Sequence, residues 1–240
     1  MSQIKQAMIL AAGKGTRMRP LTDDRPKPLV EIRGRALIDH GLDRLEEAGV
    51  ERVVVNLHYM ADMLEAHLSK RSSPQIIFSD ERDVLLETGG GVKRALPLLE
   101  GEPFFVVNSD ALWLDPEGGP NTIRTMMDAY TARGADYLML LARRDEAVGF
   151  TGKGDFHMDG EGHLTWRKDD EIAPYMFAGV QIMNAELFAR APDGSFSNKW
   201  IWDQELIPEN RFIGHLLEGR WLHASSAEDV AAIELALGTD

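Results

Sequence analysis

A glycine-rich segment near the N-terminus carries the residues best suited to phosphate chemistry. The apolar run 8–12 ends at Gly13 and Gly15, and Arg17 follows two residues later. Small residues after a buried strand let backbone N–H groups approach an anion or a flat base. Arg17, together with Lys27 between two prolines, adds positive charge to a chain whose net charge is −13. The spacing therefore predicts a loop that binds phosphate.

Two common nucleotide-binding motifs are excluded by the spacing of these glycines. A P-loop requires a glycine, lysine and serine or threonine after four intervening residues, and this segment lacks them. A dinucleotide fingerprint requires a third glycine where Met18 stands. Gly13 and Gly15 alone would also fit a turn that needs positive φ, so only together with their neighbours do they predict phosphate binding.

A second candidate for chemistry is Asp110, which follows the apolar run 104–108. Open α/β sheets bind their ligands beyond the carboxyl ends of their strands, which is where this carboxylate would lie. Magnesium takes one or two carboxylates and completes its shell with water and phosphate oxygens. We therefore predict that Asp110 binds a metal ion. The structural alternatives are a helix N-cap or a turn residue, and Asn108 could simply hold the turn.

The pattern of the whole chain indicates how these residues are positioned. Short apolar runs alternate with helical spacing, which is typical of a mostly parallel sheet with helices on its faces. In the second half, residues 152–167 alternate like a hairpin. The predicted strands are 6–11, 52–57, 75–78, 104–108, 136–142 and 175–183, and the predicted helices are 37–48, 60–70, 92–99, 122–133 and a short one capped by Asn184.

Composition limits the class of protein. The 240 residues, 44% of them hydrophobic, are enough for one core, so we expect a single domain. The net charge of −13 argues against binding to nucleic acid or to an anionic membrane. The longest apolar runs are shorter than a membrane span or a secretory leader requires, so we expect a cytoplasmic protein. The absence of cysteine excludes disulfides, thiolate catalysis and zinc–thiolate sites.

The combined motif is far more specific than its glycines alone. Leu-Ala-Ala before Gly-x-Gly-Thr-Arg-x-x-Pro-Leu-Thr at residues 13–22, with Pro-Lys-Pro at 26–28, resembles the signature of the sugar-1-phosphate nucleotidyltransferases. This resemblance implies an α/β fold: a single-domain, three-layer αβα, Rossmann-like nucleotide-diphospho-sugar transferase fold with a mostly parallel, mixed sheet. It further implies one catalytic domain over residues 1–240, in which the N-terminal half binds nucleotide and residues from about 150 to 225 bind sugar.

Two further segments extend the resemblance. Leu-Glu-Thr-Gly-Gly-Gly-Val at 86–92 is implied to lie against the base and ribose, with Gly89 and Gly90 leaving room for the base. A plain loop before a helix is the alternative. Ala178 and Gly179, in a strand of otherwise core-forming side chains, are implied to face the sugar, as is Lys27. The implied nucleotide-binding residues are Ala11, Ala12, Gly13, Gly15, Thr16, Arg17, Glu87, Thr88, Gly89, Gly90 and Asn108.

One departure from the family pattern concerns the metal. The family typically has Trp-x-Asp-x-Gly-Thr-Pro-Glu near the C-terminus, where the Asp is a second metal ligand, and this chain has His223 in its place. Imidazole suits magnesium poorly. Either His223 assists Asp110 through water, or Asp203 or Glu205 completes the site. Residues 226–229 fit a helix start better than a metal site. We expect Mg²⁺ as cofactor, with Mn²⁺ accepted.

The implied reaction needs no nucleophilic side chain. An oxygen of a sugar 1-phosphate attacks the α-phosphorus of a nucleoside triphosphate, and pyrophosphate leaves. Catalysis is then positioning and charge neutralisation. The resemblance assigns Arg17 to the charge on the triphosphate and Lys27 to the bridge between the α-phosphate and the sugar phosphate. Asp110 would hold the metal.

Overall resemblance favours one group of substrates. The chain looks most like N-acetylmuramate-1-phosphate uridylyltransferases of peptidoglycan recycling, which use UTP, and mannose-1-phosphate guanylyltransferases are the alternative. A nucleotide-sugar-binding regulatory protein without activity is an alternative of another class. The expected assembly is a monomer or a small homo-oligomer. Basic candidates for binding a lactyl carboxylate on the sugar are Arg143, Arg144, Lys153 and Lys168.

Overall fold

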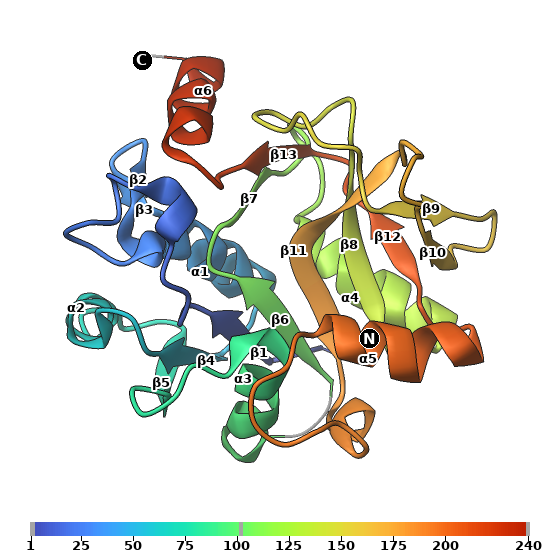
Figure 1. Cartoon of the computed structure of the whole chain (residues 1–240), viewed down its shortest axis with the longest axis horizontal. Helices are drawn as coiled ribbons and strands as arrows, with labels where there is room; N and C mark the ends of the chain where they lie inside the picture. Colours follow the sequence, from blue (N-terminus) through green and yellow to red (C-terminus); the bar gives the residue numbers. More distant parts are fainter. Residues whose placement is uncertain (1–2, 101–102, 239–240) are drawn as a thin grey trace.

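The centre of the molecule is a mixed sheet of nine strands (Figure 1), seen in a computed structural model that describes residues 3–100 and 103–238. The strand order is β10-β9-β11-β6-β1-β4-β5, and β8 pairs with β11 and β12. Both ends of the predicted domain, residues 1–2 and 239–240, lie outside the described residues. The strands of this sheet are β1 (Gln6–Leu10), β4 (Arg52–Leu57), β5 (Gln75–Asp80), β6 (Phe104–Asn108), β8 (Leu138–Arg143), β9 (Phe156–Met158), β10 (Leu164–Trp166), β11 (Tyr175–Met183) and β12 (Gly214–Leu216).

Helices cover both faces of the sheet and complete three layers. In Figure 1, α1 and α4 lie behind the sheet, and α3 and α5 lie in front of it. The predicted three-layer α/β fold is therefore confirmed. The helices are α1 (Leu37–Ala48), α2 (Ala61–Leu68), α3 (Glu87–Ala95), α4 (Thr122–Arg133), α5 (Lys199–Ile201, continued by a π-helical turn at Trp202–Leu206) and α6 (Ala227–Leu237). Short 3₁₀ turns are Thr16–Met18, Lys27–Leu29, Leu96–Leu98, Ala185–Phe188 and Ile207–Glu209.

Alternation along the central strands produces the two buried layers. Successive side chains of a strand point to opposite faces, so Met8 and Ile9 enter different cores. One core packs Ile9 against α1, α2 and α4, and the other packs Met8 against α3 and the 187–206 region. Burial on both faces explains the nearly continuous apolar runs that predicted these strands.

The direction of the strands determines where a ligand can bind. Strands β6, β1, β4 and β5 are mutually parallel, so their carboxyl ends meet at one edge of the sheet. Strand β11 runs antiparallel to both β6 and β8. The loops that follow the four parallel strands therefore lie along one edge of the sheet, where an open α/β sheet binds its ligands.

A smaller layer closes one side of this edge. It consists of the pair β7 (Ala111–Leu114) and β13 (Arg220–His223) and the hairpin β2 (Glu31–Ile32) to β3 (Arg35–Ala36), with α6 packed against them (Figure 1). The predicted helix start at residues 226–229 is confirmed as a capping box. Asp229 N–H donates to Ser226 Oγ at 3.1 Å, and Ser226 N–H donates to Asp229 Oδ2 at 2.8 Å.

Two local predictions are corrected by the structure. The glycines of segment 86–92 do not form a turn before a helix, because α3 already begins at Glu87 and contains all three of them. Asn184 precedes a 3₁₀ turn, but its side chain makes no capping hydrogen bond. Its Nδ2 instead donates to the carbonyl of Asp136 at 3.5 Å. No helix in the described ranges combines the length and apolar character of a membrane span.

Candidate active site

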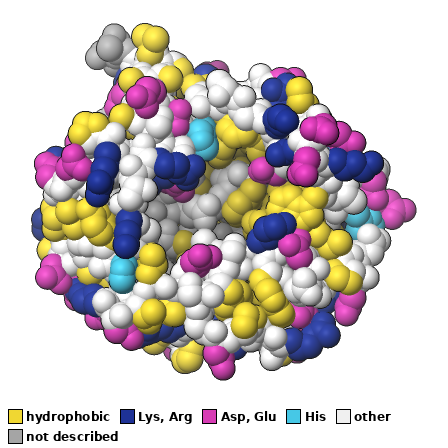
Figure 2. All heavy atoms as spheres, in the orientation of Figure 1, with side chains coloured by type: hydrophobic (Ala, Val, Ile, Leu, Met, Phe, Trp, Pro, Cys, Tyr) yellow, Lys and Arg dark blue, Asp and Glu magenta, His cyan; other side chains and the backbone are white. Residues whose placement is uncertain are grey.

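A cavity of about 450 Å³ lies at the carboxyl ends of the parallel strands. Figure 2 shows a hollow in the middle of this face, with Lys and Arg side chains on its rim. The loop after β1, the end of β6 and the start of α3 line the cavity. The lining includes the predicted residues Ala11, Ala12, Gly13, Gly15, Thr16, Arg17, Lys27, Glu87, Thr88, Asn108 and Asp110.

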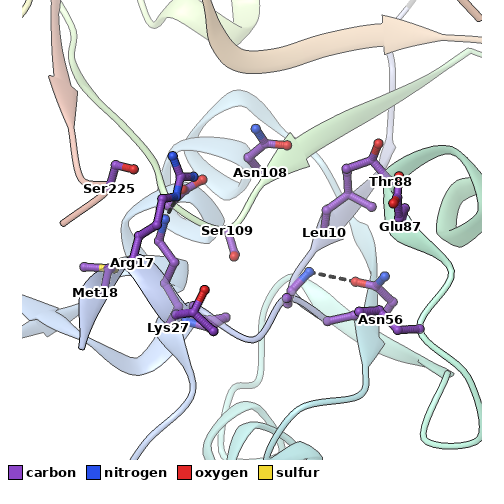
Figure 3. Close-up of a pocket in the computed structure, with 18 of the residues that line it drawn as sticks. Leu10, Arg17, Met18, Lys27, Asn56, Glu87, Thr88, Asn108, Ser109 and Ser225 are labelled. Carbon is purple, nitrogen blue, oxygen red and sulfur yellow. Dashed lines mark hydrogen bonds and ion pairs between the residues drawn. The ribbon is translucent and has the colours of Figure 1, made fainter. Parts of the chain in front are cut away.

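Figure 3 shows two chemically different sides of this cavity. Arg17 and Lys27 lie side by side on one side, and Glu87, Thr88 and Asn56 lie on the other. A triphosphate suits the basic side. The opposite side offers backbone groups, the side chains of Asn56 and Thr88 and the carboxyl group of Glu87, which suit the base and the hydroxyl groups of a nucleoside.

A smaller cavity of about 190 Å³ adjoins the first. The two share Arg17, Asn108, Asp110 and Ser225 as lining residues, so these side chains stand at their border. The smaller cavity is further lined by the predicted sugar contacts Ala178 and Gly179, and by Phe150, Asp155, Met176, Phe177, Trp221 and His223. Apolar and aromatic side chains next to polar and charged ones suit a sugar ring with its hydroxyl groups.

Gly179 has a conformation that explains its residue type. Its φ is +87°, at the irregularity in the pairing of β11 with β8. A Cβ atom at this position would lie 2.7 Å from the Cβ atom of Ala111. The indole N–H of Trp221 donates to the carbonyl of Ala178 at 3.2 Å and fixes the neighbouring backbone. These contacts keep this part of β11 open to the smaller cavity.

The three predicted catalytic residues come together at the border of the two cavities. Lys27 Nζ donates a hydrogen bond to Asp110 Oδ2, although the two residues are 83 positions apart. Lys27 begins a 3₁₀ turn with Pro28 at its next position, and only 13% of its side chain is exposed. The proline fixes the local backbone, so the ammonium is directed at the border rather than into solvent.

Gly89 and Gly90, which are predicted to contact the base, line neither cavity. A Cβ atom at Gly89 would lie 2.4 Å from the ring of Phe196, and one at Gly90 would lie 2.2 Å from the carbonyl oxygen of Gly194. Gly90 N–H also donates to Phe196 O at 3.0 Å. In this structure the two glycines make room for residues 194–196, and contact with a base stays a prediction.

His223 lines the smaller cavity together with Asp110. Burial lowers the pKa of His223, against the opposing charges of Asp229 and Asp110. The imidazole packs edge-on against Phe150, with ring centroids 5.3 Å apart. Its Nε2 is 3.9 Å from Asp229 Oδ2, an oxygen that already accepts the N–H groups of Ser225 and Ser226. His223 is therefore a neutral nitrogen donor near Asp110.

The two other carboxylates considered for the metal have different partners. Asp203 accepts from the indole of Trp166 at 2.7 Å, and Glu205 pairs with Arg190 at 2.6 Å. Neither lines the two cavities. Within the described ranges, no three His, Asp or Glu side chains cluster closely enough to hold an ion. Asp110 still fits Mg²⁺, because the ion needs few protein carboxylates when phosphate oxygens complete its shell.

Several site residues were missed by the sequence analysis. Asn56, Ser109 and Ser225 line the larger cavity, and Asp155 lines the smaller one. Asp155 accepts the N–H of Phe177 at 3.2 Å, and burial raises the pKa of its carboxyl group. Asn56 could have been recognised in the sequence, because it is a polar residue within the apolar run of β4. The basic residues proposed for a lactyl carboxylate line neither cavity: Arg143, Arg144, Lys153 and Lys168.

Comparison with known proteins agrees with this geometry. The family of the MobA-like NTP transferase domain matches residues 7–232. An N-acetylmuramate alpha-1-phosphate uridylyltransferase of Caulobacter vibrioides is 45% identical over 237 residues, covering 97% of each chain. A protein of the same name from Neisseria meningitidis is 34% identical and covers 90% of this chain and 91% of its own.

Other relatives match less of the chain or only its fold. A mannose-1-phosphate guanylyltransferase subunit of Drosophila melanogaster is 40% identical over 112 residues, which are 45% of this chain and 30% of its own. The crystal structure of HddC from Yersinia pseudotuberculosis in complex with GMP-PN has a TM-score of 0.75 at 22% identity, covering 98% of this chain and all of its own. This chain therefore belongs to the MobA-like NTP transferase domain family and is a nucleotidyltransferase.

Proposed function

We propose that this enzyme transfers a uridylyl group from UTP to N-acetylmuramate 1-phosphate and releases pyrophosphate. The contact between Lys27 and Asp110, at the border of a larger and a smaller cavity, is the observation that carries this proposal. This contact supports a site in which a cation and a carboxylate act together on the phosphate groups of both substrates. The 45% identity with the Caulobacter uridylyltransferase over 97% of both chains supports the choice of UTP and of the sugar.

The chain's own residues can position both substrates for an in-line attack. UTP would occupy the larger cavity and the sugar 1-phosphate the smaller one. A sugar-phosphate oxygen forms a bond to the α-phosphorus while the bond from that phosphorus to the departing pyrophosphate breaks. Lys27 would contact both phosphates, and Arg17, which lines both cavities, would balance the triphosphate charge. Mg²⁺ held by Asp110 would supply further charge neutralisation at the phosphoryl oxygens.

The sugar would lie between an apolar wall and a polar one. Phe177 and Trp221 offer flat apolar surface, and Asp155 offers a half-buried carboxyl group. Because one oxygen of Asp155 is held by Phe177 N–H, the other can bind a sugar hydroxyl. Recycling of cell-wall sugar in the cytoplasm is the setting that this reaction would serve.

The alternatives have weaker support. The guanylyltransferase relative matches 45% of this chain, less than half of it. A silent binding protein would not need Lys27 and Asp110 in contact beside Arg17. Both alternatives remain outcomes of the experiment that follows.

The test is pyrophosphate release with Mg²⁺, crossing UTP, GTP, CTP and dTTP with N-acetylmuramate 1-phosphate, N-acetylglucosamine 1-phosphate, glucose 1-phosphate and mannose 1-phosphate. Product mass identifies the nucleotide sugar. We expect the highest kcat/KM for UTP with N-acetylmuramate 1-phosphate. Preference for GTP with mannose 1-phosphate would assign the chain to the guanylyltransferases. If no pair of substrates releases pyrophosphate, with Mg²⁺ or with Mn²⁺, the result would contradict an enzymatic role.

His223 predicts an unusual metal preference. If its imidazole contacts the ion, Mn²⁺ should support turnover at least as well as Mg²⁺, because nitrogen suits Mn²⁺ better than the harder Mg²⁺. His223→Asp should then shift the ratio of kcat with Mn²⁺ to kcat with Mg²⁺ toward Mg²⁺. His163→Asp is the control, because His163 lines neither cavity. The same metal ratio in wild type and His223→Asp would rule out direct contact.

A further inference from the structure

A chain of hydrogen bonds crosses the carboxyl edge of the sheet beneath the larger cavity. Asn56, at the end of β4, accepts the N–H of Ala11 on its Oδ1 at 2.7 Å, the contact drawn in Figure 3. The Nδ2 of Asn56 donates to Glu81 Oε1 at 3.0 Å. On the other side, the carbonyl of Leu10 accepts the N–H of Ser109 at 3.1 Å. The peptide between Leu10 and Ala11 is thus held from both sides.

Glu81 is an unusual member of this chain. Its side chain is fully buried, and its Oε2 has no hydrogen-bond partner among the described residues. Burial raises the pKa of this carboxyl group, against the hydrogen bond from Asn56, and the charged or titratable groups that face it are Arg94, His58 and Asp83. Arg94 pairs with Asp83 at 2.9 Å rather than with Glu81. The carboxyl group of Glu81 thus acts here as a buried hydrogen-bond acceptor for Asn56.

Helix α3 packs closely against Asn56 and Glu81. A Cβ atom at Gly91 would lie 3.0 Å from Asn56 Nδ2 and 3.1 Å from Glu81 Oε1. This close approach explains why a glycine stands in the second turn of α3, where it costs helix stability. The backbone of α3 excludes water from the hydrogen bond between Asn56 and Glu81.

The arrangement determines which way the amide of Asn56 points. A carboxamide presents an acceptor on one side and donors on the other, and Ala11 N–H requires the acceptor. Glu81 Oε1 accepts from the opposite side and so selects this orientation. Without it, the amide could turn its donors toward Ala11, and the N–H of that residue would lose its partner.

We propose that Glu81 is a positioning residue for the nucleotide: through Asn56 it fixes the Leu10–Ala11 peptide and so shapes the backbone wall of the larger cavity. The inference rests on the proposed function, because it takes that cavity to bind the triphosphate. The chain of hydrogen bonds ends at Ser109, which directly precedes Asp110. It therefore connects Glu81 to the carboxylate that is proposed to hold the metal.

The test compares Glu81→Gln with Glu81→Leu. Glutamine keeps the shape of the side chain and a carbonyl acceptor for Asn56, so KM for UTP should stay within about twofold of wild type. Leucine has a similar volume but no acceptor, and KM for UTP should rise about 10-fold. KM for the sugar 1-phosphate should change by less than about twofold, because the smaller cavity is lined by other residues. Asp83→Asn is the matched control, since Asp83 faces Glu81 without touching Asn56.

A second variant keeps the test decisive if Glu81→Leu does not fold. Asn56→Ala should raise KM for UTP by a similar factor, and combining it with Glu81→Leu should add little. Equal effects on both substrates, or a lower Tm with unchanged UTP binding, would reduce Glu81 to a structural residue and overturn the proposal. The same loss in Glu81→Gln as in Glu81→Leu would also overturn it. Failure of the proposed function shows separately, as wild-type protein that binds no UTP in an equilibrium titration.

Discussion

Asp110→Asn should lower kcat by about 10² to 10³ while the protein stays folded. Asparagine has nearly the same shape as aspartate, but it lacks the negative charge that pairs with Lys27 and would hold Mg²⁺. The side chain is partly exposed at the border of the two cavities, so the exchange leaves no buried cavity behind. Pyrophosphate release at saturating concentrations of both substrates, with Tm measured in parallel, gives the result.

The control for this prediction is Asp193→Asn. Asp193 also pairs with a lysine, Lys93, at 2.7 Å, but its side chain is 98% exposed and lines neither cavity. Its replacement should leave kcat unchanged, because exposed ion pairs contribute little. A folded Asp110→Asn enzyme with wild-type kcat at every Mg²⁺ concentration would remove Asp110 from the proposed mechanism.

Lys27→Met should lower kcat by a similar factor, about 10² to 10³. Methionine keeps most of the apolar stem but removes the ammonium of the only lysine that lines either cavity, among the residues that the structure describes. Lys27→Arg should restore little activity. The guanidinium is larger and planar, and the 3₁₀ turn with Pro28 leaves the backbone no freedom to move it back.

Measurements with both substrates separate chemistry from binding in the lysine variants. A loss confined to kcat indicates that Lys27 acts on the transition state, whereas a rise in KM alone indicates ground-state binding. Lys5→Met is the control, because Lys5 is exposed, pairs with Glu51 and lies far from the cavities in the chain's fold. Full activity in Lys27→Arg would mean that any positive charge suffices at this position.

The central strands and the main helices could be predicted because their cause is local. An apolar run buried on both faces identifies β4 and β6, and the prediction gave their ends correctly as Arg52–Leu57 and Phe104–Asn108. The α4 helix, Thr122–Arg133, was predicted to the residue for a similar reason. In contrast, β7 and β13 are four residues each and pair across more than 100 positions, so no local pattern identifies them.

The residues of the candidate site likewise fall into two groups, those that a local motif predicts and those that depend on distant partners. Lys27 and Asp110 could be proposed because each stands in a recognisable motif, and the structure brings them into contact. Asn56 and Asp155 were missed, because their roles depend on partners elsewhere in the sequence, Ala11 and Phe177. Gly89 was assigned to the base, yet its nearest neighbour is Phe196, a packing contact that only the folded chain reveals.

The different strand directions on the two sides of the border have an evolutionary consequence. The larger cavity, proposed for the nucleotide, lies at the ends of the parallel strands β1, β4 and β6, which are joined by hydrogen bonds. The smaller cavity, proposed for the sugar, is lined from antiparallel β11 and the separate pair of β7 and β13. If both proposals hold, substitutions in the second wall alone can change the preference for the acceptor while the donor site keeps its structure.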